Sequence, residues 1–128
     1  MKSTIFVVAM IGLSINASAA EVVVNPGMKI TAHDVRDIYL GEMIAVSGVT
    51  LQPLDNAAAQ EKFATTILKL PIEKYQSIWT KKAFRDGLTA PALKKDDAEV
   101  IEFVKRTPGA IGYIEGSSPP DLVSILKF

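Results

Sequence analysis

The residues best suited to binding chemistry lie where a predicted strand meets a predicted helix. The strand covers Val49–Leu54, and the helix begins near Asn56. Backbone amides at the start of such a helix point outward at the carboxyl end of the strand. Open α/β sheets usually bind ligands there, and the helix dipole favours an anion. Asn56, Ala57 and Ala58 are therefore candidate ligand-binding residues.

Asp55 stands at the same junction and argues against an anion site. Its carboxylate would repel an anion, and the segment from Asn56 to Ala59 offers no hydroxyl donor. We favour the interpretation that Asp55 caps the helix, which aspartate does well. A weak anion site and a purely structural helix cap both remain open.

No residue pattern predicts catalysis, a metal site or a cofactor. His33 is the only histidine, and we interpret it as a solvated residue in the first turn of a helix. The neighbouring acids Asp96 and Asp97 are explained by helix capping. The sequence contains no cysteine, no P-loop and no G-x-S-x-G or H-E-x-x-H motif. We therefore predict that the protein is not an enzyme.

A group of basic residues flanks one predicted loop and could meet a polyanion. Its members are Lys81, Lys82, Arg85, Lys94 and Lys95. Acidic residues interrupt the group, and the 128-residue chain has 14 basic and 14 acidic side chains, so no overall charge attracts nucleic acid or lipid. We interpret the group as a solvated face and Trp79 as a core residue, and we predict no nucleic-acid binding.

The N-terminal 19 residues have the pattern of a signal peptide. Lys2 precedes the apolar run Ile5–Ile15, and Ala17-Ser18-Ala19 forms an A-x-A cleavage motif. The run is shorter than the ~20 residues that span a bilayer. We expect cleavage of residues 1–19, a mature domain at 20–128 without stable membrane insertion, and a periplasmic location (or secretion from a host without an outer membrane).

The rest of the chain predicts one compact α/β domain. The predicted strands are Glu21–Asn25, Val49–Leu54, Ala110–Glu115 and Leu122–Lys127. Predicted helices begin near Thr31, Asn56, Pro71 and Asp96, and Arg85–Lys95 is predicted to be a loop because of its Gly and Pro. Strands that alternate with helices favour a sheet covered by helices on its faces.

Four stretches together resemble a known family. They are VVVN at Val22–Asn25, DVRDIYLGE at Asp34–Glu42, YQSIWTKKAF at Tyr75–Phe84 and TPGAIGYI at Thr107–Ile114. In this order they resemble short periplasmic phosphate-binding-protein-like domains, which are related to the substrate-binding proteins of phosphate ABC transporters. The resemblance implies an α/β fold: a single lobe of a type II periplasmic-binding-protein-like fold, with a mixed sheet flanked by helices.

The resemblance also implies roles for two glycines. The GAIGY strand would lie near the ligand face of the lobe, with Gly109 turning the chain out of a helix. Gly112 would leave space for a neighbouring backbone or a ligand. Gly109 and Gly112 therefore join the candidate ligand-binding residues.

Two departures from the family restrict what the resemblance implies about function. Transport receptors hold their ligand between two lobes, and about 109 mature residues suffice for one. The Ser/Gly/Thr-rich loop of phosphate binders is replaced by Leu54–Gln60, which has no hydroxyl.

Two functions stay open. One is an exported, non-enzymatic binding module that binds a small anion such as phosphate weakly or contacts an inner-membrane or envelope protein. The alternative is an accessory protein that acts only through protein–protein contacts.

Overall fold

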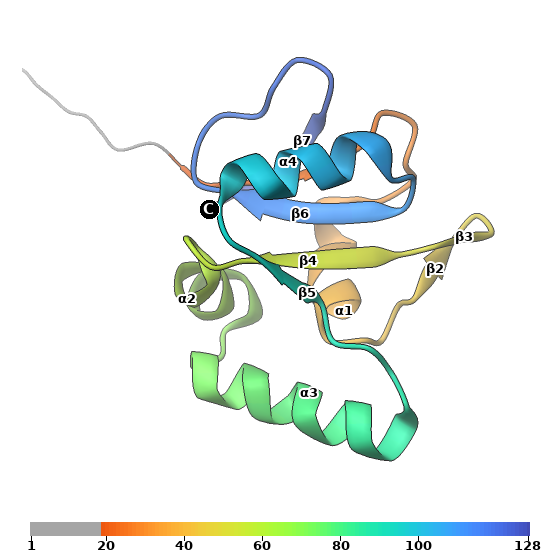
Figure 1. The fold of residues 1–128 in the computed structure, drawn as a ribbon, viewed down its shortest axis with the longest axis vertical. Helices are drawn as coiled ribbons and strands as arrows, with labels where there is room; N and C mark the ends of the chain where they lie inside the picture. The colour runs from red at the N-terminus through yellow and green to blue at the C-terminus, as the bar shows by residue number, and fades with distance from the viewer. Residues whose placement is uncertain (1–18) are drawn as a thin grey trace, which may run out of the picture.

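The computed structural model describes residues 19–128, so the predicted signal peptide lies outside the described residues except for Ala19. Figure 1 shows the arrangement of the elements. In chain order they are β1 (Glu21–Val24), the 3₁₀ helix η2 (Ala32–Asp34), α1 (Val35–Tyr39), β2 (Ala45–Val46), β3 (Val49–Thr50), β4 (Gln52–Asn56), α2 (Gln60–Phe63), the π-helix η3 (Ala64–Leu68), α3 (Ile72–Asp86), β5 (Ala92–Lys94), α4 (Asp97–Arg106), β6 (Ala110–Ile114) and β7 (Val123–Lys127).

A five-stranded sheet in the order β5-β4-β6-β1-β7 forms the centre of the molecule. Strand β4 runs parallel to both β5 and β6, whereas β1 runs antiparallel to β6 and β7. The sheet is therefore mixed, as the family resemblance implies. A separate hairpin of β2 and β3 extends from one side (Figure 1).

Helices cover both faces of the sheet. Side chains of β6 alternate between two cores, with Ile111 and Tyr113 in one and Ala110 and Ile114 in the other. The first core also contains buried residues of α1, α2, η3 and α3, whereas Val100 and Val104 of α4 fill the second. This period of two along a fully buried strand is what a sheet packed on both faces requires. The predicted α/β class is confirmed.

Three local predictions need correction. The predicted strand Val49–Leu54 is divided, because Val49 and Thr50 pair in the hairpin and the sheet strand begins only at Gln52. The helix expected near Asn56 starts at Gln60, after a turn. The predicted loop Arg85–Lys95 contains β5, a three-residue edge strand that follows Pro91 and pairs with β4.

No helix among residues 19–128 is long and apolar enough to cross a membrane.

Candidate binding edge of the sheet

The carboxyl ends of β4 and β6 meet at one edge of the sheet because the two strands are parallel. Asn56 ends β4, Glu115 follows β6, and Asp97 starts α4 at this edge. This is the position at which open α/β sheets bind ligands. We call Asn56, Asp97, Glu115 and Gly116 the edge cluster.

Asn56 has no exposed surface, and its side chain is fully engaged within the protein. Its Nδ2 donates to Oδ1 of Asp97 at 2.8 Å and to the carbonyl of Tyr113 at 2.9 Å. Its Oδ1 accepts from the amide of Ala58 at 3.0 Å. The amide of Ala57 donates to the carbonyl of Lys94 at 2.8 Å. The polar groups that we expected to face an anion at Asn56, Ala57 and Ala58 therefore already have acceptors or donors within the chain.

Asp97 accepts hydrogen bonds from the remaining donors at this edge. Besides Asn56, its carboxylate accepts from the amide of Glu115 at 3.0 and 3.1 Å and from the amide of Gly116 at 2.9 Å. Three converging N–H groups are what an anion site provides. Here a carboxylate of the same chain accepts all three. We predicted only a helix-capping role for Asp97. Its distant partners could not be predicted, because they come together only when β4 pairs with β6.

Asp55 is a buried residue, and the prediction that it caps the following helix is wrong. Its side chain points to the opposite face of β4, where it accepts from the hydroxyl of Tyr75 at 2.8 Å and from that of Tyr113 at 2.7 Å. The residue is only 3% exposed. The turn is instead closed by Asn56 through its bond to Ala58.

Burial controls the ionisation of this group. Desolvation raises the pKa of Asp55, and the hydrogen bonds from Tyr113, Tyr75 and Gln60 oppose that rise. Burial and the nearby carboxylate also raise the pKa of Tyr75 and Tyr113, so both phenols stay protonated and can donate.

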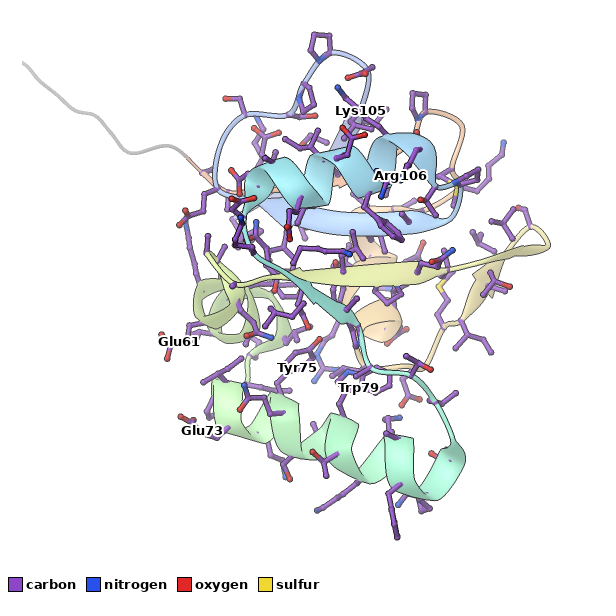
Figure 2. All side chains as sticks on the ribbon, viewed as in Figure 1. Glu61, Glu73, Tyr75, Trp79, Lys105 and Arg106 are labelled. Carbon is purple, nitrogen blue, oxygen red and sulfur yellow. The ribbon has the colours of Figure 1, made fainter. Side chains whose placement is uncertain are left out.

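Aromatic packing fixes the tyrosines around Asp55. The ring of Tyr113 stacks on Phe63 with 4.1 Å between centroids, and the Tyr39 hydroxyl donates to the carbonyl of Leu54 at 2.7 Å. The indole N–H of Trp79 donates to the carbonyl of Tyr39 at 2.8 Å. Figure 2 shows Tyr75 and Trp79 extending from α3 toward the sheet. Trp79 is a core residue, as predicted.

The two candidate glycines serve the packing of the fold. Gly109 has φ +90°, and a Cβ there would overlap the carbonyl oxygen of Thr50, so the predicted turn after the helix is confirmed. A Cβ on Gly112 would lie 2.5 Å from Cγ1 of Val100. The space at Gly112 is therefore filled by α4, and not by the neighbouring backbone or ligand that we expected.

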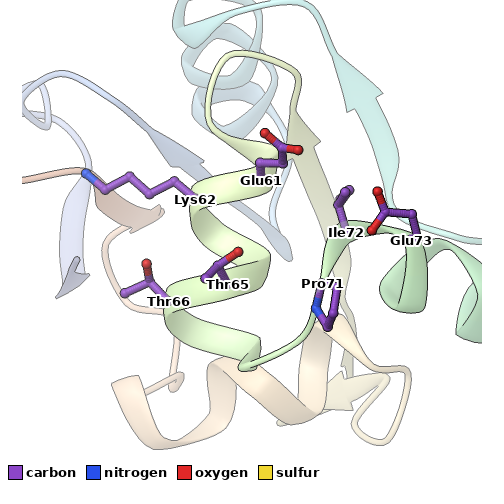
Figure 3. Close-up of a pocket in the computed structure, with 7 residues that line it drawn as sticks. All are labelled: Glu61, Lys62, Thr65, Thr66, Pro71, Ile72 and Glu73. Carbon is purple, nitrogen blue, oxygen red and sulfur yellow. The ribbon is translucent and has the colours of Figure 1, made fainter.

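A cavity of about 490 Å³ opens beside α2, η3 and the start of α3 (Figure 3). Thr65 and Thr66 give it hydroxyl groups, but Glu61 and Glu73 give it two carboxylates against the single ammonium of Lys62. This charge balance disfavours an anion there.

The remaining candidates are dispersed. His33 is exposed in η2. Lys82 pairs with Glu42 at 2.9 Å, and Lys94 lies over the ring of Phe103 at 4.7 Å from its centroid, so these members of the basic group have partners within the fold. Within residues 19–128, no three His, Cys, Asp or Glu side chains are placed to hold a metal ion.

Comparison with solved structures identifies the fold. An ABC-type phosphate transport receptor from Vibrio cholerae is 16% identical with a TM-score of 0.53, over 84% of this chain and 45% of that one. A protein described as a phosphate ABC transporter substrate-binding protein from Clostridium perfringens, solved with bound phosphate, is 14% identical with a TM-score of 0.59, over 84% and 44%. PstS from Borrelia burgdorferi is 21% identical with a TM-score of 0.50, over 76% and 40%.

These similarities show a fold that corresponds to about one lobe of the type II periplasmic binding fold. The chain spans less than half the length of each of these proteins. No protein-family model and no curated protein matches the sequence.

Proposed function

We propose that this protein is an exported, non-enzymatic binding module that acts by contacting an inner-membrane or envelope protein, and that it binds orthophosphate weakly at best. The signal-peptide pattern of residues 1–19 supports export. The fold of the described residues resembles phosphate-binding proteins. The observation that carries the proposal of weak phosphate binding is that the carboxylate of Asp97 already accepts hydrogen bonds from the donors of the edge cluster.

Tight phosphate binding requires several N–H or O–H donors that are free to point at the anion. In the edge cluster these donors are bonded to Asp97, so phosphate would have to displace a carboxylate that is covalently part of the chain. Binding at Asn56, Ala57 and Ala58 would also require breaking the bonds from Ala57 to Lys94 and from Ala58 to Asn56. A single lobe further leaves half of a bound anion to solvent, where water competes for its oxygens.

Weak binding of a small anion is the second candidate function. An α-helix leaves its first amides without acceptors in the helix, and in α2 these belong to Gln60, Glu61 and Lys62. Glu61 places a carboxylate in the same turn. These amides support an affinity in the millimolar range at most, which corresponds to about 4 kcal/mol.

Two measurements test the proposal. Calorimetry of the mature protein with orthophosphate at low salt should give a dissociation constant no tighter than about 1 mM. A pull-down of tagged mature protein from its native envelope should recover a stable protein partner without added phosphate. A micromolar constant would restore phosphate binding as the direct function. Failure to recover any envelope protein, together with millimolar phosphate binding, would leave the second candidate.

A further inference from the structure

A second cavity, separate from the edge cluster, lies between α3 and the edge strand β5 and has a volume of about 330 Å³. Ligand pockets range from about 300 to 1,000 Å³, so this one is suited to a small molecule or a single side chain. We call it the Asp55 cavity. Its lining residues include Asp55, Tyr75 and Trp79 on the inner side and Ala83, Pro91 and Leu93 around them.

The acidic group of this cavity has no basic partner in the lining. Asp55 is the only charged residue in its lining, which otherwise contains Gln60, Gln76 and Thr80 as polar residues. No salt bridge to Asp55 exists among residues 19–128. A carboxylate can accept about four hydrogen bonds, and the hydroxyls of Tyr75 and Tyr113 supply two. An acceptor position therefore remains for an incoming donor.

The other walls fit a cation on an apolar stem. Tyr75 and Trp79 line the cavity, and aromatic faces attract ammonium and guanidinium groups through their quadrupoles. Leu93 is 59% exposed and, with Ala83 and Pro91, gives the cavity an apolar wall that methylene groups could cover. An anion would meet a carboxylate and no basic side chain.

We propose that the Asp55 cavity binds a primary ammonium group carried on an alkyl chain, with Asp55 as its counter-ion and Leu93 and Pro91 against the alkyl chain. Two sources share this chemistry: a free alkylamine and a lysine side chain of a protein partner. The site is independent of the phosphate question, because it lies on the opposite face of β4 from Asn56 and Asp97 and contains none of the edge cluster.

Trp79 is the only tryptophan, so its fluorescence reports on the cavity directly. The protein should show a saturable change with n-butylammonium and no comparable change with n-butanol or orthophosphate. Asp55→Asn keeps the shape and removes the charge, and it should weaken n-butylammonium binding at least tenfold. Glu73→Gln is the matched control: it removes an exposed carboxylate from α3, the helix that carries Tyr75 and Trp79, and it should leave the affinity for n-butylammonium unchanged.

A second variant keeps the test decisive if Asp55→Asn does not fold. Ala83→Met narrows the cavity without touching the hydrogen bonds of Asp55, and it should also weaken the binding of n-butylammonium at least tenfold.

A blocked tripeptide with a central lysine separates the two sources of the ammonium group. Tighter binding of the peptide than of n-butylammonium indicates a protein partner, whereas binding of the free amine alone indicates a small molecule. Equal responses to n-butylammonium and n-butanol, or unchanged affinity in both cavity variants, would overturn the proposal.

Discussion

Asn56 donates a side-chain hydrogen bond to Asp97 across 2.8 Å, and this bond joins the end of β4 to the first residue of α4. Both residues belong to the edge cluster, and the same carboxylate accepts the amides of Glu115 and Gly116 after β6. One side chain therefore connects three segments that are far apart in sequence. The structural role of Asp97 and the weak anion binding that we propose have the same cause.

Removing this carboxylate should lower stability and improve phosphate binding. In Asp97→Asn, the donors of Asn56, Glu115 and Gly116 lose a charged acceptor, so we expect a loss of about 1–3 kcal/mol in the free energy of unfolding. Urea denaturation measures the loss, and calorimetry with orthophosphate measures the gain in affinity.

Asp121→Asn is a matched control because Asp121 forms only a surface ion pair with Lys105 at 3.4 Å. We expect it to change neither stability nor phosphate affinity appreciably. If Asp97→Asn behaved like this control, the edge donors would not depend on Asp97.

Substitution of Gly112 should expose the contact between β6 and α4. In Gly112→Ala the new methyl would lie 2.5 Å from Cγ1 of Val100, and we expect this overpacking to cost about 1–3 kcal/mol. Val100→Ala removes the opposing methyl groups, so the double variant should lose less stability than the sum of the two single variants. Urea denaturation of all four proteins gives the coupling energy, and strict additivity would show that Val100 is not the residue that excludes a side chain.

Asp55 should make stability depend on pH in a defined direction. Burial raises its pKa in the folded chain above the value of about 3.9 expected in the unfolded chain. Between these two values the folded protein holds a proton that the unfolded protein has released, so the contribution of Asp55 to stability falls as pH rises through that window. In the Asp55→Asn variant the side-chain amide at this position does not titrate.

As pH rises, the unfolding free energy of Asp55→Asn should therefore increase relative to that of the unmodified protein. This difference should level off once Asp55 is ionised in the folded state. Urea denaturation at a series of pH values measures the difference. A shift in the opposite direction would mean that the tyrosine hydroxyls lower the pKa of Asp55 more than burial raises it.

Export should remove residues 1–19. The prediction rests on Lys2, the apolar run Ile5–Ile15 and the A-x-A motif that ends at Ala19. Intact-mass measurement of the protein from an envelope fraction should give a chain that begins at Ala20. Recovery of the full-length chain from that fraction would contradict cleavage.

The sequence predicted the fold better than the candidate site. Apolar periodicity located α3 and α4, and Asp96 caps α4 through the amide of Glu99 at 3.1 Å, as the capping pattern indicated. Periodicity missed β5, because a three-residue edge strand beside Pro91 is too short to show alternation.

The hydrogen-bond partners in the candidate site could not be predicted from residues that are neighbours in the sequence. Asp55 and Asn56 are adjacent, yet strand alternation sends them to opposite faces of β4, one to the tyrosines and the other to Asp97. The capping hypothesis considered only partners within a few positions of Asp55. Its actual donors, Tyr75 and Tyr113, lie 20 and 58 positions away, and only the assembled sheet brings them together.

The position of β1 between β6 and β7 has a consequence for when this domain can fold. Its two neighbours are β6 and β7, with Glu21 opposite Ile114 on one side and Val24 opposite Val123 on the other. The ribosome makes both partner strands roughly 90–100 residues after β1, so β1 has no neighbour on either side until synthesis is almost complete. Pairings this distant along the chain close slowly. The nascent polypeptide is therefore nearly complete before this part of the sheet can form, and a chain that folds this late stays unfolded long enough to pass through a secretion pore, as the export that we propose requires.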